Sequence, residues 1–595
     1  MIIEQIYTGC LSQGSYYIES NGNAAVIDPL REISPYIEKA KKNNSKIKYV
    51  FETHFHADFV SGHVTLAKET GATIIYGPEA KTSYNALIAK DNQEFKIGEI
   101  SIIVLHTPGH TIESTTYLLR DSSNKDIAIF TGDTLFIGDV GRPDLAQKAV
   151  NMTQEDLAGI LFNSLRKKIM PLADNVLVYP AHGAGSACGK NLSKETVGTL
   201  GEQKKSNYAL RSDMTKKEFI KEVTEGLLPP PQYFPLNVKM NKNGYEDIDK
   251  VLQSGTTALD PALFEEIANQ SGAVILDVRH QEDFAKEHIP QSIFIGIDGS
   301  FAPWVGAMIG DVAQPILLLT PKGREKETVT RLARVGFDNT LGYLKGGLDA
   351  WKKSKRDTDF VNCIDAENFI ELSKKENLSV LDVRKPGEYI SENFPTSQSI
   401  PLDFINENMN LFPKNSPFYI HCAGGYRSMI AASILKSRGI HNLFDVKGGF
   451  SEIKKANATD FSSLTKLPSQ FQEATLSSIS SSFIEQQLKL LEDHGTQLSP
   501  KALSTLAKNL KSNIEDDKII DLLWDIYHYE NSTFFIRSEI VNIMGGFTGV
   551  YAGRMVMYQS SKGGVYRLRN FFLSFDNTAT PNMLHDHPIR KIITQ

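Results

Sequence analysis

The sequence predicts an α/β protein of several domains, and three observations lead to this prediction. Strand-like and helical runs alternate through about the first 240 residues, a segment of about 100 residues occurs twice in the middle of the chain, and a length of 595 residues allows about four domains. We therefore expect a two-sheet αββα sandwich at 1–240, two small doubly wound α/β domains at 256–356 and 362–458, and an unassigned α+β region at 466–595.

Composition and charge exclude several classes of protein. The net charge of -6 gives no reason to expect nucleic acid or an anionic membrane as a partner. The first residues lack the pattern of a signal peptide, and no apolar run approaches the ~18 residues of a spanning helix. The four cysteines, Cys10, Cys188, Cys363 and Cys422, are too far apart to suggest a disulfide framework, so a reducing cytoplasm is expected.

The expected elements of the first region follow in order along the chain. Strands are predicted at 15–19, 24–28, 47–51, 72–76, 100–106, 116–119 and 126–130, and helices at 33–42 and 64–70. The βα alternation, with polar residues in the loops after strands, favours two sheets covered by helices.

The loop after the strand at 47–51 carries His54, His56 and Asp58 at alternate positions. On an extended segment or tight loop this spacing turns side chains to one side, where they can converge on a metal ion. Further candidate ligands follow apolar runs and lie beside Gly or Pro: His110, Asp133 and His182.

These motifs, in this order, resemble those of the metallo-β-lactamase superfamily. The runs 137–144 and 182–189 are similar to the persulfide dioxygenases within it. The resemblance implies one iron ion bound by His54, His110 and Asp133. It also implies that His56, Asp58 and His182 orient these ligands or face the substrate.

Residue 59 departs from the pattern of the two-metal hydrolases of this superfamily, which place a histidine directly after the aspartate of the first motif. Here the residue is Phe59, and the loss of this imidazole argues for a single metal ion. Two imidazoles and one carboxylate with open positions suit non-haem Fe(II) and O₂, although imidazoles also favour zinc.

Three more residues of the first region are candidates for the site. Arg142 either grips a carboxylate or phosphate of the thiol carrier or pairs with a neighbouring aspartate, Asp139 or Asp144. Tyr179 is expected to line the pocket. Cys188 either accepts and relays sulfur or is a small packed residue, and we favour the packed residue.

The run 226–235 contains four prolines and cannot be a regular helix or central strand, so it is interpreted as a stiff connector. A polar stretch to about residue 255 follows. Beyond it, Leu276-Asp277-Val278-Arg279 recurs 105 residues later at Leu381, and Lys345-Gly346-Gly347 recurs 102 residues later at Lys447. This repeat resembles the rhodanese domain, whose fold is a small doubly wound unit.

The second copy carries the rhodanese signature. Cys422 ends a strand and begins a tight loop whose backbone N–H groups, together with a helix N-terminus and Arg427, would stabilise a thiolate or persulfide. The Cys-x4-Arg spacing resembles that of sulfur-transferring members, which implies a nucleophilic Cys422. The remaining loop residues are expected to bind substrate: Gly424, Gly425, Tyr426 and Ser428.

The first copy has no cysteine in the matching loop and cannot form a cysteine persulfide. We interpret it as a non-catalytic domain that spaces or docks its neighbours, with Lys322, Arg324 and Lys326 as solvated charges rather than an anion site. The region 466–595 shows helical and strand patterns and a His585-x-His587 pair, interpreted as a surface loop, and resembles no family that we can identify.

The order of domains resembles fusions of persulfide dioxygenase, rhodanese-like domain and rhodanese. It implies that a low-molecular-weight thiol persulfide and O₂ are converted to sulfite and thiol at one Fe(II) per chain, and that Cys422 transfers sulfane sulfur to or from thiosulfate. A homo-oligomer is also implied. The alternatives are a glyoxalase-type thioester hydrolase with two metals and a non-catalytic sulfur carrier or sensor.

Overall fold

The computed structural model describes residues 1–147, 151–190, 192–227 and 229–456, so the patterns predicted within 466–595 lie outside the described residues. The chain divides into two compact units, Met1–Asn362 with Met429–His441, and Cys363–Ser428 with the chain from Asn442. Among the described residues, no helix has the length and apolarity needed to cross a membrane.

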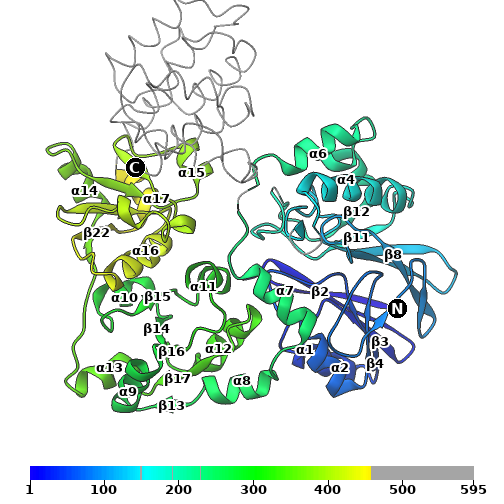
Figure 1. The fold of residues 1–595 in the computed structure, drawn as a ribbon, viewed down its shortest axis with the longest axis horizontal. Coiled ribbons are helices and arrows are strands. Elements are labelled where there is room, and N and C mark those ends of the chain that lie inside the picture. The colour runs from blue at the N-terminus through cyan, green and yellow to red at the C-terminus, as the bar shows by residue number, and fades with distance from the viewer. Residues whose placement is uncertain (148–150, 191, 228, 457–595) are drawn as a thin grey trace, which may run out of the picture. The chain divides into compact units, whose positions relative to one another are not determined.

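Two six-stranded sheets form the first region (Figure 1). In the first sheet the strands lie in the order of the chain: β1 (Ile2–Thr8), β2 (Gln13–Ser20), β3 (Asn23–Ile27), β4 (Lys46–Glu52), β5 (Thr73–Tyr76) and β6 (Leu87–Ile88). In the second sheet they run in reverse order from β12 (Gly198–Thr199) through β11 (Leu177–Pro180), β10 (Asp126–Gly132), β9 (Thr115–Arg120) and β8 (Ile100–His106) to β7 (Glu94–Ile97).

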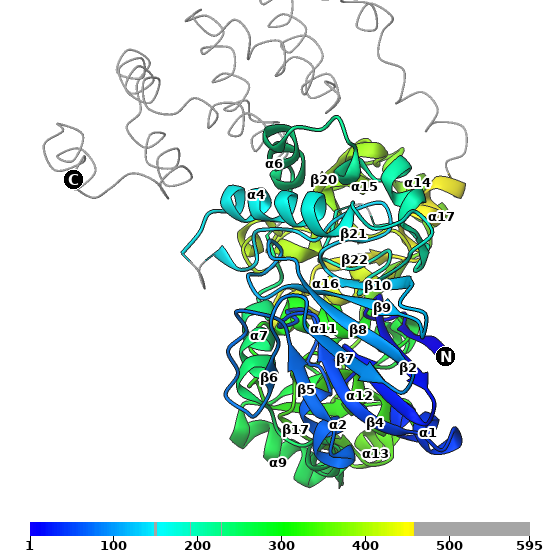
Figure 2. The same cartoon turned by 90° about the vertical axis from the view of Figure 1, so that its right-hand side faces the viewer.

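The two sheets pack face to face through a shared apolar core, and strands of both sheets are labelled in Figure 2. Tyr16, Ile18 and Phe51 of the first sheet meet Ile102 and Phe130 of the second, all buried. The outer faces are covered by helices, α1 (Ser34–Lys42) and α2 (His63–Thr70) on the first sheet and α4 (Gln154–Ser164), α5 (Leu200–Ser206) and α6 (Lys216–Thr224) on the second. The predicted αββα sandwich is therefore confirmed.

Helix boundaries in this region follow from local capping. Thr153, Thr199 and Thr215 each accept a hydrogen bond from the backbone of the first turn of α4, α5 and α6, and an acidic residue three positions later bonds back. Helix α4 continues into a π-helical turn at Leu165–Ile169. A short 3-10 turn, Tyr208–Leu210, follows α5.

The stretch after the proline run differs from the prediction. The described residues of 226–233 form neither helix nor strand, as predicted for the connector, but helices α7 (Phe234–Asn243) and α8 (Ile248–Gly255) occupy the segment after it, which we expected to be a polar stretch. Pro235 lies in the first turn of α7, where its missing N–H has no intrahelical partner to lose. The buried face of α7 includes Asn237 and Asn241, so an apolar periodicity was absent from the sequence.

The two copies of the repeat fold alike, each around a five-stranded sheet. In the first the order is β13 (Ala258–Leu259), β17 (Thr340–Leu344), β16 (Ile316–Leu319), β14 (Val274–Asp277) and β15 (Ile293–Phe294). In the second it is β18 (Asn362–Ile364), β22 (Leu443–Val446), β21 (Phe418–His421), β19 (Val380–Asp382) and β20 (Ser397–Ser399). Strands of equal rank occupy equal places, as an internal repeat requires.

Helices complete both copies. The first has α9 (Pro261–Ser271), α10 (Gln281–Lys286), α11 (Phe301–Ile309), α12 (Glu325–Arg334) and α13 (Gly347–Lys353), and the second has α14 (Ala366–Ser373), α15 (Pro386–Ser391), α16 (Tyr426–Ser437) and α17 (Gly449–Ala456). Two short 3-10 turns, Leu402–Phe404 and Met409–Leu411, also belong to the second copy.

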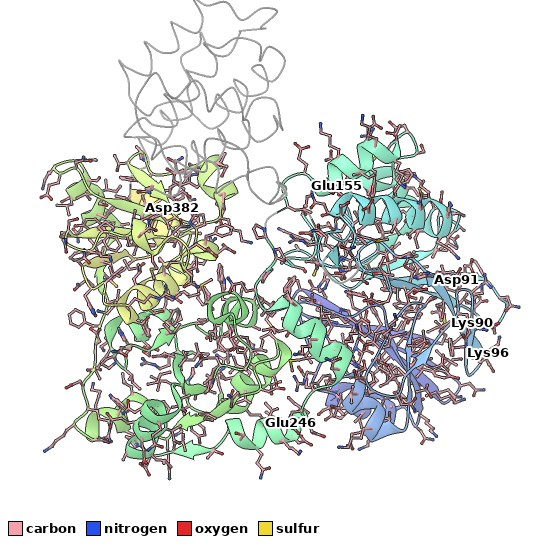
Figure 3. All side chains as sticks on the ribbon, in the orientation of Figure 1. Lys90, Asp91, Lys96, Glu155, Glu246 and Asp382 are labelled. Carbon is pink, nitrogen blue, oxygen red and sulfur yellow. The ribbon has the colours of Figure 1, made fainter. Side chains whose placement is uncertain are left out.

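The repeated Asp-x-Arg motif has the same geometry in both copies. The Arg384 guanidinium donates two hydrogen bonds to the carboxylate of Asp382, labelled in Figure 3, and another to the Glu392 carbonyl. Arg279 forks onto Asp277 and donates to the Glu287 carbonyl in the same way. The motif thus ties a strand end to the loop after the following helix, as expected of residues that shape the fold.

Candidate functional site

The metal-binding loop begins where β4 ends, and its first imidazole is oriented by a hydrogen-bonded relay. Asp28, directly after β3, accepts hydrogen bonds from the Thr53 backbone at 2.8 Å and from the Thr53 hydroxyl at 2.8 Å. The hydroxyl oxygen lies 3.0 Å from His54 Nδ1. Since this oxygen accepts the Nδ1 proton, the lone pair of His54 lies on Nε2, the atom that faces the site.

The first triad contains the three residues that the family resemblance implied as metal ligands. His54, His110 and Asp133 are buried, and their ligand atoms lie within 4.8 Å of one another. Asp133 Oδ2 is 3.4 Å from His110 Nε2 and 3.9 Å from His54 Nε2. His110 Nδ1 donates to the Arg142 carbonyl at 2.8 Å, which leaves Nε2 free to coordinate.

Both carboxylate oxygens of Asp133 are buried without a hydrogen-bond partner among the described residues. Buried acceptors in this state are rare and costly unless an ion or water completes them. Burial, together with the neighbouring imidazoles, lowers the pKa of His54 well below its usual value, which keeps this ring neutral. The triad therefore fits a divalent metal ion held by two neutral imidazoles and one carboxylate.

A second buried triad lies beside the first and contains Asp58, His182 and Cys188. His182 Nε2 is 3.5 Å from Asp58 Oδ2 and 3.6 Å from Asp133 Oδ1, so Asp133 faces both triads. His182 Nδ1 donates to the Ser12 carbonyl at 3.2 Å, which directs Nε2 into the site. Cys188 is both packed and part of the site, although the sequence had favoured packing alone.

The thiol of Cys188 lies in a setting that disfavours its ionisation. Burial, with Asp58 and Asp133 adding to it, raises the pKa of Cys188 well above its usual value. Burial also raises the pKa of Asp58. Both shifts favour the protonated form of the group over its charged form.

His56 turns away from both triads. Its Nε2 lies 3.0 Å from Asp28 and 3.6 Å from Glu52, in a third buried cluster behind the loop. Burial favours the neutral ring, but Asp28 and Glu52 overcome it and raise the pKa of His56 to about 9. The three side chains of the His-x-His-x-Asp run thus point into three different clusters, rather than to one side as their spacing predicted.

Arg142 and Tyr179 were predicted to contact substrate, and the structure shows other contacts for each. Arg142 is buried, donates two hydrogen bonds of 2.7 Å to Asp144, and donates a third to the Ala187 carbonyl. The pairing with an aspartate was one of the two roles left open by the sequence. The Tyr179 ring stacks on Phe130 between the sheets. A substrate contact for either residue remains a prediction.

The second candidate centre lies at the end of β21. Cys422 is fully buried, and Gly425 donates its backbone N–H to the Cys422 sulfur at 3.1 Å. Gly425 has φ of +92°, a conformation that glycine adopts without strain and that turns its N–H inward. Helix α16 begins at Tyr426, so its N-terminus adds positive potential near the sulfur.

The sequence did not reveal the partner of Arg427. Its guanidinium donates to both carboxylate oxygens of Glu388, at 2.6 and 2.7 Å, from a position 16 % exposed. Glu388 lies on α15, far away in sequence, and no local pattern indicates the pair. The ion pair with Arg427 holds the pKa of Glu388 below its usual value. The positive charge of Arg427 is therefore balanced by the carboxylate of Glu388.

The other residues of this loop have mainly local roles in the structure. Ser428 is buried and donates to the Gly425 carbonyl at 3.3 Å. A side chain at Gly424 would meet nothing within 4 Å, whereas Gly425 faces the Gly448 backbone. Contact of Gly424, Gly425, Tyr426 and Ser428 with substrate stays a prediction.

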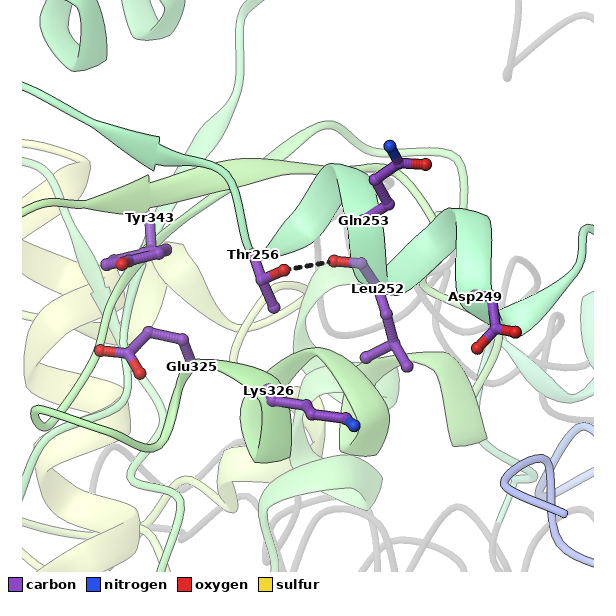
Figure 4. Close-up of a pocket in the computed structure, with 7 residues that line it drawn as sticks. All are labelled: Asp249, Leu252, Gln253, Thr256, Glu325, Lys326 and Tyr343. Carbon is purple, nitrogen blue, oxygen red and sulfur yellow. Dashed lines mark hydrogen bonds between the residues drawn. The ribbon is translucent and has the colours of Figure 1, made fainter. Parts of the chain in front are cut away.

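In the first copy, the loop that corresponds to the Cys422 loop contains an arginine that is ion-paired with two carboxylates. Arg324 donates to Asp298 at 2.6 Å and to Glu327 at 2.7 Å, so it is committed to carboxylates. The lining of a surface depression nearby (Figure 4) includes no cysteine, no histidine and no residue of either candidate centre. Its lining consists of Asp249, Leu252, Gln253, Thr256, Glu325, Lys326 and Tyr343.

Comparison with known families agrees with these two centres. The model of the metallo-beta-lactamase superfamily matches residues 8–182, and the model of the rhodanese-like domain matches 260–354 and again 365–456. Each family model therefore covers one of the folds described above.

Individual relatives carry the names of two different enzymes. The chain is 30 % identical over 250 residues to Glyoxylase B2 of Dictyostelium discoideum, covering 78 % of that protein and 38 % of this one. It is 29 % identical over 224 residues to the human mitochondrial persulfide dioxygenase ETHE1, covering 78 % of it and 37 % of this chain.

One solved structure extends the similarity beyond the first region. A metallo-beta-lactamase from Staphylococcus aureus is 31 % identical, with a TM-score of 0.52, and the match covers 58 % of this chain and 99 % of that one.

Proposed function

Because this chain belongs to the metallo-β-lactamase superfamily and joins two rhodanese-like domains to that fold, we propose that it is a persulfide dioxygenase fused to a sulfurtransferase. One observation carries the proposal: a buried triad of two imidazoles and one carboxylate occurs in the same chain as a cysteine held in a sulfur-binding loop. The similarity to a persulfide dioxygenase and the sulfur chemistry of rhodaneses both support it.

The first triad would hold Fe(II) through His54, His110 and Asp133. When bound, Fe(II) supplies the redox chemistry that allows O₂ to react with sulfur. The net reaction is RSSH + O₂ + H₂O → RSH + SO₃²⁻ + 2H⁺, in which the outer sulfur loses four electrons and O₂ accepts them. Zinc would bind similar ligands but cannot take part in this redox change.

The residues around the triad would handle substrate and protons. His182 faces Asp133 Oδ1, whereas His54 and His110 face Oδ2, so a persulfide sulfur or the attacking water would be placed beside His182 and Asp58. His182 can accept a proton at Nε2, because its Nδ1 is fixed as the donor to Ser12. The thiol of Cys188 lies in the same cluster, and we propose that it contacts the sulfane sulfur.

At the second centre, Cys422 would carry the sulfane sulfur. The transfer Cys–S–S⁻ + SO₃²⁻ → Cys–S⁻ + S₂O₃²⁻ breaks the S–S bond of the persulfide and forms the S–S bond of thiosulfate. The Gly425 N–H and the N-terminus of α16 would stabilise the negative sulfur in both states. The reverse direction would supply persulfide from thiosulfate, and either direction would join the two centres in one sulfide-detoxifying sequence.

A thioester hydrolase of the glyoxalase type is the second candidate, and the similarity to Glyoxylase B2 favours it. Such hydrolases use two metal ions, and Phe59 occupies the position of one second-metal imidazole. The Phe59 ring is fully buried, with its centroid 4.4 Å from that of the His56 ring, and it offers no ligand. Metal stoichiometry separates the two candidates.

The test is oxygen uptake by purified, iron-loaded protein supplied with persulfides of glutathione, coenzyme A and other small thiols. The proposal expects O₂ consumption with sulfite as product for at least one carrier, and no hydrolysis of S-lactoylglutathione. Hydrolysis of the thioester by protein with two metal ions, without O₂ uptake, would support the second candidate.

A further inference from the structure

The loop that carries His54, His56 and Asp58 is held from outside the metallo-β-lactamase fold. Five backbone groups between residues 56 and 61 bond to residues beyond 230: the carbonyls of His56, Asp58 and Phe59, and the N–H groups of Val60 and Ser61. Buried backbone groups need partners, so the conformation of this loop depends on those residues.

Asn241 provides three of these bonds. It is fully buried near the end of α7, which lies between the first sheet and the first repeat in Figure 1. Its Nδ2 donates to the carbonyls of His56 and Phe59 at 2.8 Å each, and its Oδ1 accepts from the N–H of Ser61 at 2.9 Å. One amide thus spans both sides of the loop around Asp58.

The cysteine-less repeat contributes directly as well. The N–H of Val60 donates to the Arg334 carbonyl at 2.7 Å, at the end of α12. Next to this bond, the fully buried Arg31 donates to the Ala333 carbonyl at 3.0 Å and pairs with Asp338 at 2.7 Å. Arg31 also donates to the backbone carbonyl of Glu246, a residue that precedes α8 in the chain and is labelled in Figure 3.

Arg31 is also close in sequence to the relay that orients His54. Asp28, three residues earlier, accepts both hydrogen bonds from Thr53. A segment of four residues therefore connects a metal ligand on one side with the first repeat on the other.

The packing at the start of α7 is equally close. Tyr233 donates its hydroxyl to the Asp58 carbonyl at 3.3 Å. Its ring lies against Gly306 of α11, where an added Cβ would approach the ring to 2.4 Å. Only glycine permits this contact. The start of α7 therefore touches both the loop and the first repeat.

We propose that helix α7 and the cysteine-less rhodanese-like repeat form the positioning scaffold of the metal site, with Asn241 and Arg31 as positioning residues. They touch neither metal nor substrate. They fix the backbone from His56 to Ser61, and through it the directions of His54 and Asp58. The repeat has no cysteine in its own loop, and its proposed role is to hold the backbone of the neighbouring metal site in place. The inference holds for whichever divalent metal the site takes.

The test uses the full chain loaded with Fe(II), or with Co(II) as a spectroscopic probe, and compares Asn241→Ala and Arg31→Met with wild type. Two matched controls accompany them. Asn237→Ala removes an equally buried asparagine one turn earlier on α7 that has no hydrogen bond to the loop. Arg356→Met removes an arginine of the same repeat that is ion-paired with Glu265 rather than hydrogen-bonded to the loop.

The readouts are the rate of metal release to a chelator, the visible bands of the Co(II) form, and hydrogen exchange over residues 55–61. We expect Asn241→Ala and Arg31→Met to release metal about tenfold or more faster, to shift the Co(II) bands, and to exchange faster in this loop. Both controls should match wild type, even where their unfolding midpoints fall.

Wild-type release rates, Co(II) bands and loop exchange in Asn241→Ala and Arg31→Met would overturn the proposal. If Asn241→Ala does not fold, Arg31→Met decides the outcome alone. None of these readouts requires turnover, so failure of the dioxygenase proposal would leave this test unaffected.

Discussion

Arg427 and Glu388 form a bidentate ion pair beside the buried sulfur of Cys422, so the charge expected to attract sulfur anions is balanced before substrate arrives. This pair sets how strongly the loop binds a dianion. The loop sequence by itself suggests an unpaired positive charge beside the cysteine, whereas the structure pairs that charge with a carboxylate from another helix.

Glu388→Gln should strengthen anion binding. The neutral amide would retain a hydrogen bond but release the charge of Arg427, which at partly buried sites is worth roughly 1 kcal/mol toward an anion. We expect the KM for thiosulfate to fall about fivefold with little change in kcat, measured by steady-state sulfur transfer to a thiol. Glu367→Gln, an exposed change on α14, is the control. An increased KM would show that Glu388 positions Arg427 productively rather than restraining it.

Cys422→Ser separates the two proposed activities. Because a hydroxyl cannot carry sulfane sulfur, thiosulfate formation and consumption should fall to background while O₂ uptake with a thiol persulfide continues. The measurement is product analysis of sulfite and thiosulfate in the same reaction. Loss of O₂ uptake in this variant, with its iron content intact, would contradict two chemically independent centres.

Single substitutions should distinguish the two neighbouring triads. His110→Ala and Asp133→Ala remove ligands of the first triad, and we expect each to lower iron content by at least about tenfold. His182→Asn should retain one metal ion per chain but lose turnover, because it removes the proposed proton acceptor. Metal analysis by mass spectrometry checks this. Loss of half of the metal from a two-ion wild type would instead indicate the hydrolase.

Asp445 should make the stability of the second copy depend on pH. Burial raises the pKa of Asp445 to about 7. A raised pKa means that the folded state binds the proton more tightly than the unfolded state does. The contribution of Asp445 to stability is therefore greatest below about pH 4 and falls as pH rises to about 7, by up to about 4 kcal/mol at about 1.4 kcal/mol per unit.

Asp445→Asn should remove this dependence, so that the variant gains stability relative to wild type between about pH 5 and about pH 8. Denaturant unfolding across that range provides the measurement. Parallel pH profiles for the two proteins would show that Asp445 is already ionised in the folded state.

Sequence patterns succeeded where a local period reports burial. The strand predicted at 100–106 has those bounds as β8, because an apolar run sufficed to indicate a strand buried on both faces. The repeat was visible because its recurring motif is local: Asp382 and Arg384 lie two residues apart and pair with each other. The first triad was predicted through its resemblance to a known family, and the structure brings its three residues together, whereas their binding of iron remains a prediction.

Patterns failed where contacts join distant segments. Helix α7 buries asparagines instead of apolar residues, so Asn237 and Asn241 gave no helical signal. His56 faces Asp28 because of the turn after β3, which the alternation of residues 54–58 does not encode. The pairing of Arg427 with Glu388 likewise depends on how α15 packs, and no local rule reveals it.

Oxygen consumption by iron-loaded protein with a thiol persulfide tests the central claim most directly. The account predicts one iron per chain, one O₂ consumed per sulfite formed, and no uptake with zinc in place of iron. Zinc-bound protein that is as active as the iron form, or iron-loaded protein that leaves both persulfide and O₂ unchanged, would contradict it.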